Sequence, residues 1–339
     1  DLEMVKTEII SQSIDMKTSL ASKSTLISRW EWLSESKYNM SSEIERYKNV
    51  TRSDILRVYN KYIKNRKAVI NQVRPKSPFT NESDSIISKN PNANLILKND
   101  PEYNNLIYNK ANSEFDVCCR SVQPKPTISK TPKIPQFYKE NFENGLKTIF
   151  SESNEVPKVY LRLKINGGSL LENEKKAGLA SFTAQMMNES TINNSSEDIS
   201  VELQKLGSTV NFSSEGQTTT LYIECLTEKL TPTLNIVKEK LFLPAFNQDD
   251  FKRVKKSNLE GLESMKKNAQ YLAQNSMSKV LYGNSPMGWN MNKKSIKKIK
   301  LKDIKTFYNN YSPNVSELVI VGNVKKERIY KELDFLKKW

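Results

Sequence analysis

Proline and glycine are distributed so unevenly that they divide this chain of 339 residues into three regions. Eight of the 13 prolines lie in residues 75–135, and the first glycine is Gly145. Because proline interrupts helices and central strands, residues 1–74 are expected to form uninterrupted regular structure. Residues 75–135, rich in Pro, Asn, Ser and Lys, are predicted to be an interdomain linker. Residues 136–339 are then a second, near-complete domain.

The apolar pattern of residues 1–74 predicts helices. Apolar side chains recur at roughly helical spacing from Leu2 to Leu33, which indicates one or two amphipathic helices. A further helix is expected to begin near Thr51, because residues 51–54 have the form of a capping box, with a hydroxyl first and a carboxylate three residues later. Residues 68–73 are predicted to form a short strand.

Residues 136–339 show both the alternation typical of strands and the spacing typical of helices. The predicted strands are 145–150, 159–165, 209–212, 218–225 and 317–321, of which the third and fourth form a β-hairpin. The predicted helices are 175–189, 197–206, 231–242, 249–281 and 302–309, with a final helix ending near Trp339. The expected fold class is therefore α+β.

An internal repeat connects the two ends of the chain. Residues 54–62 match residues 303–311 at a constant offset of 249, with five identities in nine positions. At the same offset, Val69 falls on Leu318, so a helix and the strand after it repeat together. Tandem homologous domains leave this kind of pattern. Residues 1–74 are therefore predicted to be the C-terminal part of an α/β domain that is incomplete here.

The chain contains no histidine, which excludes zinc sites built on imidazole, Ser-His and Cys-His nucleophile pairs, and histidine general bases. The three cysteines, Cys118, Cys119 and Cys225, have neither the even number of a disulfide framework nor the spacing of a thiolate metal site. The longest apolar runs are far shorter than the roughly 20 residues that span a bilayer, so no membrane span is predicted.

The net charge is +15, with 53 Lys and Arg against 38 Asp and Glu. Such a charge attracts anionic partners before any specific contact forms. The lysines are spread along the whole chain, which favours a generally basic surface over a binding segment. A basic nucleic-acid-binding protein is an alternative. No recognisable binding motif accompanies the charge, so no nucleic-acid partner is predicted.

Residues 136–339 carry a series of short motifs in a fixed order. The motifs are 144–147, 156–157, 163–169, 177–180, 206–208, 243–246, 282–288 and 320–324. Their order resembles the insulinase-like, or pitrilysin/insulinase, family of metallopeptidases. The resemblance implies tandem α/β rolls with a mixed, mostly antiparallel sheet packed against helices. It also implies that the chain spans the end of the family's second domain, the linker and the third domain.

The family's active members carry H-x-x-E-H on the helix that begins at the motif of residues 177–180. Two histidines at i and i+4 share one helix face and bind one zinc, while the glutamate activates the metal-bound water. The matching positions here include Ser181, Ala184 and Gln185, so the resemblance implies a degenerate site with no catalytic residue and no metal. The family's third ligand is a glutamate on the next long helix, for which Glu260 or Glu263 could be a relic. A solvated helix face is the simpler interpretation of both.

The hairpin of residues 209–225 carries a second expectation. In active relatives the equivalent strand lies beside the zinc cleft and accepts peptide by β-addition, a mode that reads mainly the main chain. The polar residues that would form such a peptide-binding edge here are Asn211, Ser213, Ser214, Thr218 and Thr220. The alternative is that these polar side chains protect an exposed edge against aggregation.

The resemblance implies a non-catalytic segment of a zinc metalloendopeptidase, inactive alone, that forms part of a peptide-enclosing chamber. Its partners would be the upstream catalytic half, which holds the zinc, and a peptide substrate, and the location would be periplasmic or secreted. The chain opens at Asp1 inside an apparent helix, which favours a piece of a longer precursor. The alternative within the same fold is an assembly or adaptor protein without proteolytic activity.

Overall fold

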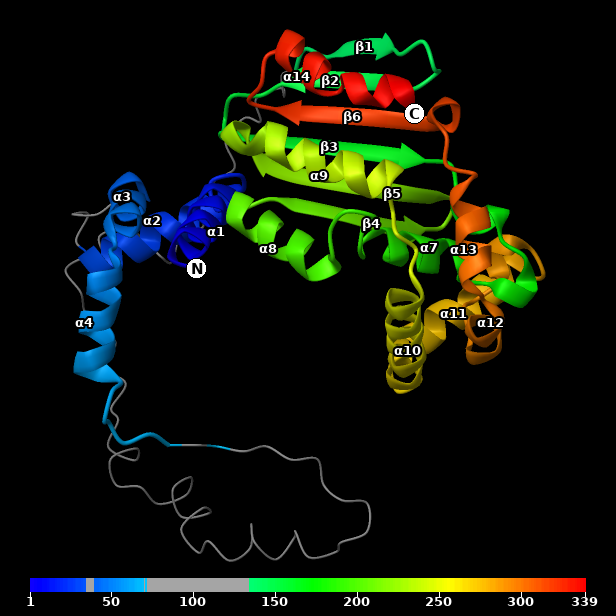
Figure 1. Cartoon of the computed structure of the whole chain (residues 1–339), viewed down its shortest axis with the longest axis horizontal. Coiled ribbons are helices and arrows are strands. Elements are labelled where there is room, and N and C mark those ends of the chain that lie inside the picture. Colours follow the sequence, from blue (N-terminus) through cyan, green and yellow to red (C-terminus); the bar gives the residue numbers. More distant parts are fainter. Residues whose placement is uncertain (35–39, 70, 72–133) are drawn as a thin grey trace, which may run out of the picture. The chain divides into compact units, whose positions relative to one another are not determined.

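The computed structural model describes residues 1–34, 40–69, 71 and 134–339 (Figure 1). Contacts group residues 1–55 and 134–339 into one compact unit and residues 56–133 into another. The predicted linker lies almost entirely outside the described residues, as do Cys118 and Cys119. The division at residues 74 and 135 therefore stays a prediction.

Six strands form a single mixed sheet in the order β1-β2-β6-β3-β5-β4 (Figure 1). The strands are β1 (Tyr138–Asn141), β2 (Lys147–Glu152), β3 (Lys158–Ile165), β4 (Thr209–Glu215), β5 (Thr218–Leu226) and β6 (Ser316–Gly322). The β2 and β6 pair is parallel, and the other four pairings are antiparallel. The predicted α+β class, with a mixed and mostly antiparallel sheet, is confirmed.

Helices pack against this sheet, and α9 and α14 lie across the same face of it (Figure 1). The helices of residues 134–339 are α7 (Leu179–Met187), α8 (Ser196–Leu206), α9 (Leu230–Phe242), α10 (Gln248–Met265), α11 (Ala269–Tyr282), α12 (Lys293–Lys298), α13 (Leu301–Tyr308) and α14 (Lys326–Glu332). The N-terminal helices are α1 (Leu2–Asp15), α2 (Leu20–Ser34), α3 (Met40–Asn49) and α4 (Arg52–Tyr62). No described helix combines the length and the apolarity that a bilayer crossing requires.

The core follows from the strand and helix periods. In β3 every second residue from Val159 to Ile165 is buried, whereas Arg162 and Lys164 are exposed. In α9 the buried apolar residues Leu230, Leu234 and Leu241 share one face of the helix. Burying each large apolar side chain stabilises the fold by about 1.5–3 kcal/mol. A slip of β3 by one residue would move its apolar side chains to the other face, so the alternation favours one register.

The helix predicted at Thr51 is confirmed as α4, with its capping box. The Thr51 main-chain N–H donates to Asp54 Oδ2 at 3.0 Å, and the Asp54 N–H donates to Thr51 Oγ1 at 3.3 Å. The strand predicted over residues 68–73 is not present at Ala68 or Val69, and most of its remainder lies outside the described residues.

The long helix predicted over residues 249–281 is wrong, because α10 ends at Met265 and α11 begins at Ala269. Asn268 separates them: its side chain accepts from the Tyr271 N–H at 3.0 Å, which caps a new helix. The helix predicted from residue 175 begins only at Leu179. Gly178 before it adopts a left-handed φ of +97°, and a Cβ there would approach the Met291 side chain to 2.7 Å.

Helix α1 packs on the sheet around one buried cation. The Lys158 side chain is 0% exposed, and its Nζ forms ion pairs with Asp15 at the end of α1 and with Glu224 Oε1 of β5, the latter at 2.5 Å. Ile14 joins Leu226 in a small apolar cluster. The cation therefore neutralises one carboxylate from the helix and one from the sheet, which ties the N-terminal helix to residues 134–339.

Candidate functional site: the facing surfaces of α7 and α10

Helix α7 carries the positions at which the resemblance places the metal motif, and its first turn is held by a remote carboxylate. Glu172 accepts hydrogen bonds from the N–H groups of Gly178 at 2.8 Å and Ala180 at 2.7 Å. Burial raises the pKa of Glu172, while these two bonds lower it. A carboxylate at a helix N-terminus satisfies amide protons that have no partner within the helix, so it fixes where α7 starts.

Apolar and aromatic side chains hold α7 against α10. Phe182 stacks on Phe251 of α10, with ring centroids 5.3 Å apart and an interplanar angle of 12°. Phe182, Leu179 and Met186 are all buried, as their helical spacing predicts. Because stacked aromatic pairs favour one relative orientation of the helices, this contact sets which polar residues face each other.

A reciprocal amide pair connects the two helices on the polar side. Gln185 Nε2 donates to Asn258 Oδ1 at 3.2 Å, and Asn258 Nδ2 donates to Gln185 Oε1 at 2.7 Å. Gln185 Nε2 also lies 3.4 Å from Ser181 Oγ, one turn earlier on α7. The structure therefore brings Ser181, Gln185 and Asn258 together on facing helix surfaces, with Ala184 buried beside them.

These residues do not fit a zinc ion. Zinc in proteins is held by imidazole, thiolate and carboxylate groups, and the site instead offers one hydroxyl and two amides that already satisfy each other. Among the residues that the structure describes, no three His, Cys, Asp or Glu side chains are grouped to hold a metal. Cys225 is buried in β5, where burial raises the pKa of its thiol to about 12, so it is protonated at neutral pH.

The glutamates considered as relics of the third ligand are directed elsewhere. Glu260 lies 3.9 Å from Lys256, and Glu263 lies 2.9 Å from Lys266 and 3.6 Å from Lys293. Both carboxylates are at least half exposed, as a solvated helix face requires. The α10 residue that contacts Gln185 is Asn258, which comes two residues before Glu260. An uncharged amide carries no chemical signature, so the sequence did not single it out.

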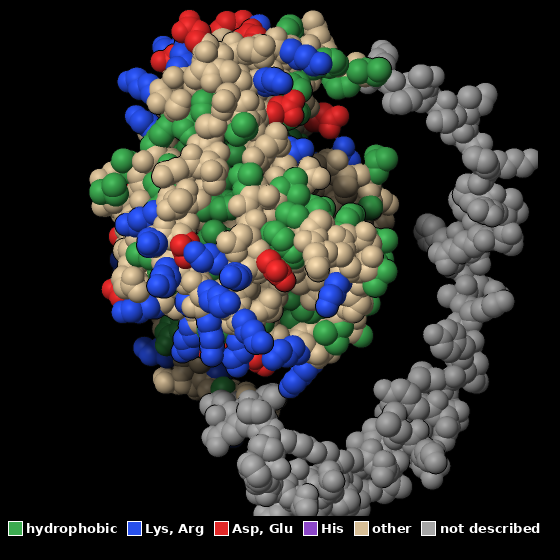
Figure 2. All heavy atoms as spheres, turned by 90° about the vertical axis from the view of Figure 1, so that its right-hand side faces the viewer, with side chains coloured by type: hydrophobic (Ala, Val, Ile, Leu, Met, Phe, Trp, Pro, Cys, Tyr) green, Lys and Arg blue, Asp and Glu red, His purple; other side chains and the backbone are tan. Residues whose placement is uncertain are grey.

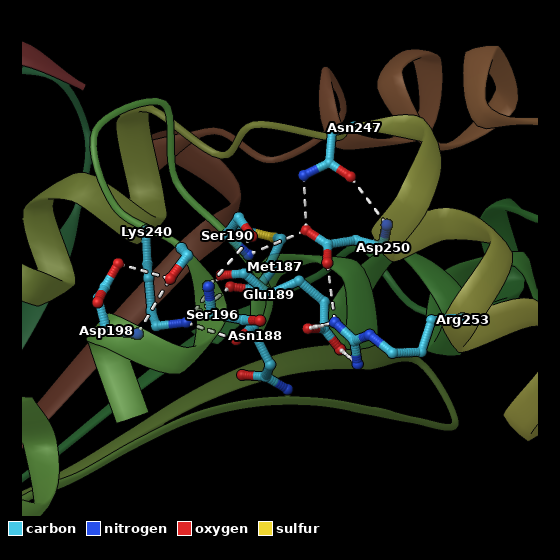
Figure 3. Close-up of polar contacts among 11 residues, drawn as sticks. Met187, Asn188, Glu189, Ser190, Ser196, Asp198, Lys240, Asn247, Asp250 and Arg253 are labelled. Carbon is cyan, nitrogen blue, oxygen red and sulfur yellow. Dashed lines mark hydrogen bonds and ion pairs between the residues drawn. The ribbon is translucent and has the colours of Figure 1, made fainter. Parts of the chain in front are cut away.

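A buried lysine anchors the C-terminal end of α7 (Figure 3). Lys240 of α9 is 2% exposed, and its Nζ donates to the main-chain oxygens of Asn188 at 2.7 Å and Glu189 at 3.3 Å. Nearby, Arg253 of α10 pairs with Asp250 at 2.8 Å and with the Glu189 carboxylate. The last carbonyls of a helix carry partial negative charge, so a cation there stabilises them. Lys240 was not singled out from the sequence, although a lysine on the apolar stripe of the helix predicted over residues 231–242 was a signal that could have found it.

Lys240 makes stability depend on pH. Burial lowers the pKa of Lys240 to about 8 from an ordinary value of 10.5, although the charges of Glu189 and Asp250 oppose this. Between about pH 8 and pH 10.5 the Lys240 side chain binds more protons in the unfolded chain than in the folded one. The free energy of unfolding therefore rises with pH over this range. We expect a rise of about 2 kcal/mol from pH 8 to about pH 10, and its absence in Lys240→Met. Urea unfolding at both pH values measures it.

Lys238, on the exposed side of the same helix, supplies the control for that titration. Lys238→Met should keep the rise of the parent protein. An equal rise in Lys240→Met and the parent would assign the pH dependence to other groups.

Exposed lysines gather on the side of the domain that carries α10 to α13, as Figure 2 shows. Residues 293–305 contain seven lysines and one aspartate, and all seven lysines are exposed. Of the seven, only Lys293 forms an ion pair within the part of the chain that the structure describes, with Glu263. The basic character predicted for the surface is thus locally dense in this segment.

The polar positions considered for peptide binding are divided between two strands. Asn211, Ser213 and Ser214 lie on β4, which among the described strands pairs with β5 alone and is an edge of the sheet. Thr218 and Thr220 lie on β5, which is an interior strand between β3 and β4, so their main chain is not at an edge. Peptide binding by this strand stays a prediction.

Comparison with known proteins identifies the relatives of this domain. Residues 148–293 match the family model described as insulinase, peptidase family M16. The chain is 28% identical over 189 residues to the non-peptidase homolog YmxG of Helicobacter pylori, covering 55% of this chain and 44% of that protein. It is 24% identical over 187 residues to the β subunit of the mitochondrial processing peptidase of Rattus norvegicus, covering 55% and 38%. The matches thus span less than half of either relative.

Solved structures show the same fold. An inactive M16 peptidase domain from Pseudomonas fluorescens superposes with a TM-score of 0.57 at 25% identity, covering 60% of this chain and 50% of that one. The periplasmic protease PqqL of Escherichia coli superposes with a TM-score of 0.54 at 18% identity, covering 62% and 24%.

Proposed function

We infer, from the membership of residues 148–293 in the insulinase peptidase family (M16), that this chain is a non-catalytic segment of a zinc metallopeptidase. The zinc site would lie in an upstream catalytic half, and residues 136–339 would form part of a chamber that encloses peptide. One observation carries this proposal: Gln185, at a position where the resemblance places a zinc ligand, forms a closed amide pair with Asn258.

The packing of α7 supports a structural role for the helix. Its N-terminus is capped by Glu172, its C-terminal carbonyls by Lys240, and its apolar face by Phe251. A helix anchored at both ends and along one face is stable without a metal, so loss of the ligands leaves the wall of a chamber intact.

The exposure of α4 supports the proposal that residues 1–74 belong to another α/β domain. The three α4 residues that align with Ile304, Phe307 and Tyr311 are 42–61% exposed, whereas those three residues are at most 5% exposed. Apolar side chains that are exposed in α4 but buried at the matching positions of residues 303–311 indicate a helix face that another part of a protein normally covers. An upstream part of the same protein is the covering partner that we propose.

Purification of the parent protein from its own cells tests this function. A tag on this segment should recover a polypeptide with an intact H-x-x-E-H motif, either as the same chain or as a tightly bound one. The purified material should cut a quenched unstructured peptide, lose that activity with a zinc chelator, and leave folded proteins intact. A periplasmic or secreted location is part of the same proposal and is tested by cell fractionation.

Two alternative functions have supporting observations. Similarity to a protein described as a non-peptidase homolog favours an assembly or adaptor protein, which would yield no chelator-sensitive peptidase. The lysines of residues 293–305 favour binding of a polyanion, including nucleic acid. Filter binding with a steep, saturable salt dependence would support that alternative, and weak binding that vanishes at moderate salt would exclude it.

A further inference from the structure

The outward edge of β4 is occupied at its centre by a side chain. The Phe212 N–H donates to Asn188 Oδ1 at 2.7 Å, and Asn188 Nδ2 donates to the Phe212 main-chain oxygen at 2.8 Å. The Asn188 amide thus hydrogen-bonds to both the N–H and the C=O of Phe212, as the backbone of an added strand would. Both main-chain groups of Phe212 must therefore point away from β5.

Strand geometry identifies the other outward positions. In an antiparallel pair, residues alternate between directing both main-chain groups at the partner strand and directing both away from it. Because Phe212 points outward, Val210 and Ser214 of β4 do so as well. Among the described residues, none outside β5 bonds to the main-chain groups of Val210 or Ser214. Asn188 therefore occupies the middle one of three outward positions.

Asn188 is held firmly in this arrangement. It directly follows the last residue of α7, and its main-chain oxygen accepts from Lys240 Nζ at 2.7 Å. Figure 3 shows Lys240 directed at the main chain around Asn188. Since Lys240 fixes the backbone and Phe212 fixes the amide, little conformational entropy remains to be lost when the side chain caps the edge.

We propose that Asn188 closes the β4 edge to strand addition, so that this domain does not pair with an extended peptide. An added strand needs the main-chain groups of alternate residues, and its backbone would have to lie where the Asn188 amide lies. The partner excluded is therefore the main chain of an extended peptide, whatever its side chains. The domain would then contribute a wall, and not a pairing strand, to the chamber proposed above.

Amide hydrogen exchange tests the closure itself. In the parent protein the Phe212 amide should exchange about tenfold more slowly than the amides of Val210 and Ser214, because one net hydrogen bond protects it. In Asn188→Ala the Phe212 rate should rise to that of its neighbours, while Leu161 in the core keeps its protection. Asn211→Ala is the matched control, since the main chain of Asn211 faces β5, and it should leave Phe212 protected.

A second variant keeps the test informative if Asn188→Ala does not fold. Asn188→Asp retains an acceptor for the Phe212 N–H but lacks the donor for its carbonyl, so Phe212 should stay protected. Fast exchange of Phe212 in the folded parent protein would overturn the proposal.

Peptide addition supplies the second arm, which rests on the proposed function. A neutral ten-residue peptide of alternating Thr and Val is the probe, because it carries no charge for the lysines to attract. It should slow exchange at Val210, Phe212 and Ser214 in Asn188→Ala and have no effect on the parent protein. Protection of all three amides in the parent, or none in the variant, would overturn the closure. Absence of a peptidase partner would refute the chamber and leave the exchange pattern unchanged.

Discussion

Replacing Lys158 with alanine is expected to lower the free energy of unfolding by about 3–5 kcal/mol, because it leaves two carboxylates without their buried cation. Asp15 and Glu224 both pair with Lys158, whose side chain is 0% exposed. Burial raises the pKa of Asp15. Burial alone would also raise that of Glu224, but the bonds from Lys158 and Tyr222 lower it. Urea unfolding at pH 7 measures the loss.

The other lysine of the same strand is the matched control for this variant. Lys164 is exposed, so Lys164→Ala should change the free energy of unfolding by no more than about 0.5 kcal/mol. Lys158→Ala should also make α1 sensitive to limited proteolysis, since Asp15 loses its partner in the sheet. Equal stabilities of the two alanine variants would show that the buried ion pairs do not hold α1 in place.

Rebuilding the missing ligands should give the site an affinity for zinc. Ser181→His and Gln185→His place two imidazoles one turn apart on α7, and Asn258→Glu adds a carboxylate from the residue that contacts Gln185. Three ligands of the types zinc prefers should bind it more than tenfold tighter than two, a difference of more than about 1.4 kcal/mol. Competition with a fluorescent chelator measures the affinity.

The double variant Ser181→His, Gln185→His separates two interpretations of α10. It keeps Glu260 and Glu263, which were predicted as possible relics of the third ligand but lie beside lysines. If the triple variant binds zinc no better than the double variant, the assignment of the third position to Asn258 fails.

Local patterns were sufficient to predict much of the fold. The capping box at Thr51, the hairpin of β4 and β5, and the apolar face of α9 all depend on residues within a few positions of one another. Such features are fixed by main-chain geometry, so a single sequence reveals them. The break at Asn268 was missed because an asparagine inside a helical pattern is compatible both with continuation and with a new cap.

The site residues could be predicted only in part. The loss of imidazoles at Ser181 and Gln185 follows from the absence of histidine, but the partner of Gln185 lies 73 residues away. Asn188 and Phe212 are 24 residues apart, and Lys240 caps a main chain 52 residues before it. These contacts arise only when α7, α9 and α10 pack together, and neutral amides give no sign in the sequence of the partner they will find.

The proposed function requires that α7 and α10 of this chain hold no zinc. Metal content of the purified protein tests that claim most directly, after incubation with excess zinc chloride and removal of unbound ions. We expect far less than one zinc per chain, and no cleavage of a quenched peptide by this chain alone. One firmly retained zinc per chain, lost on Gln185→Ala and accompanied by peptide cleavage, would contradict the account.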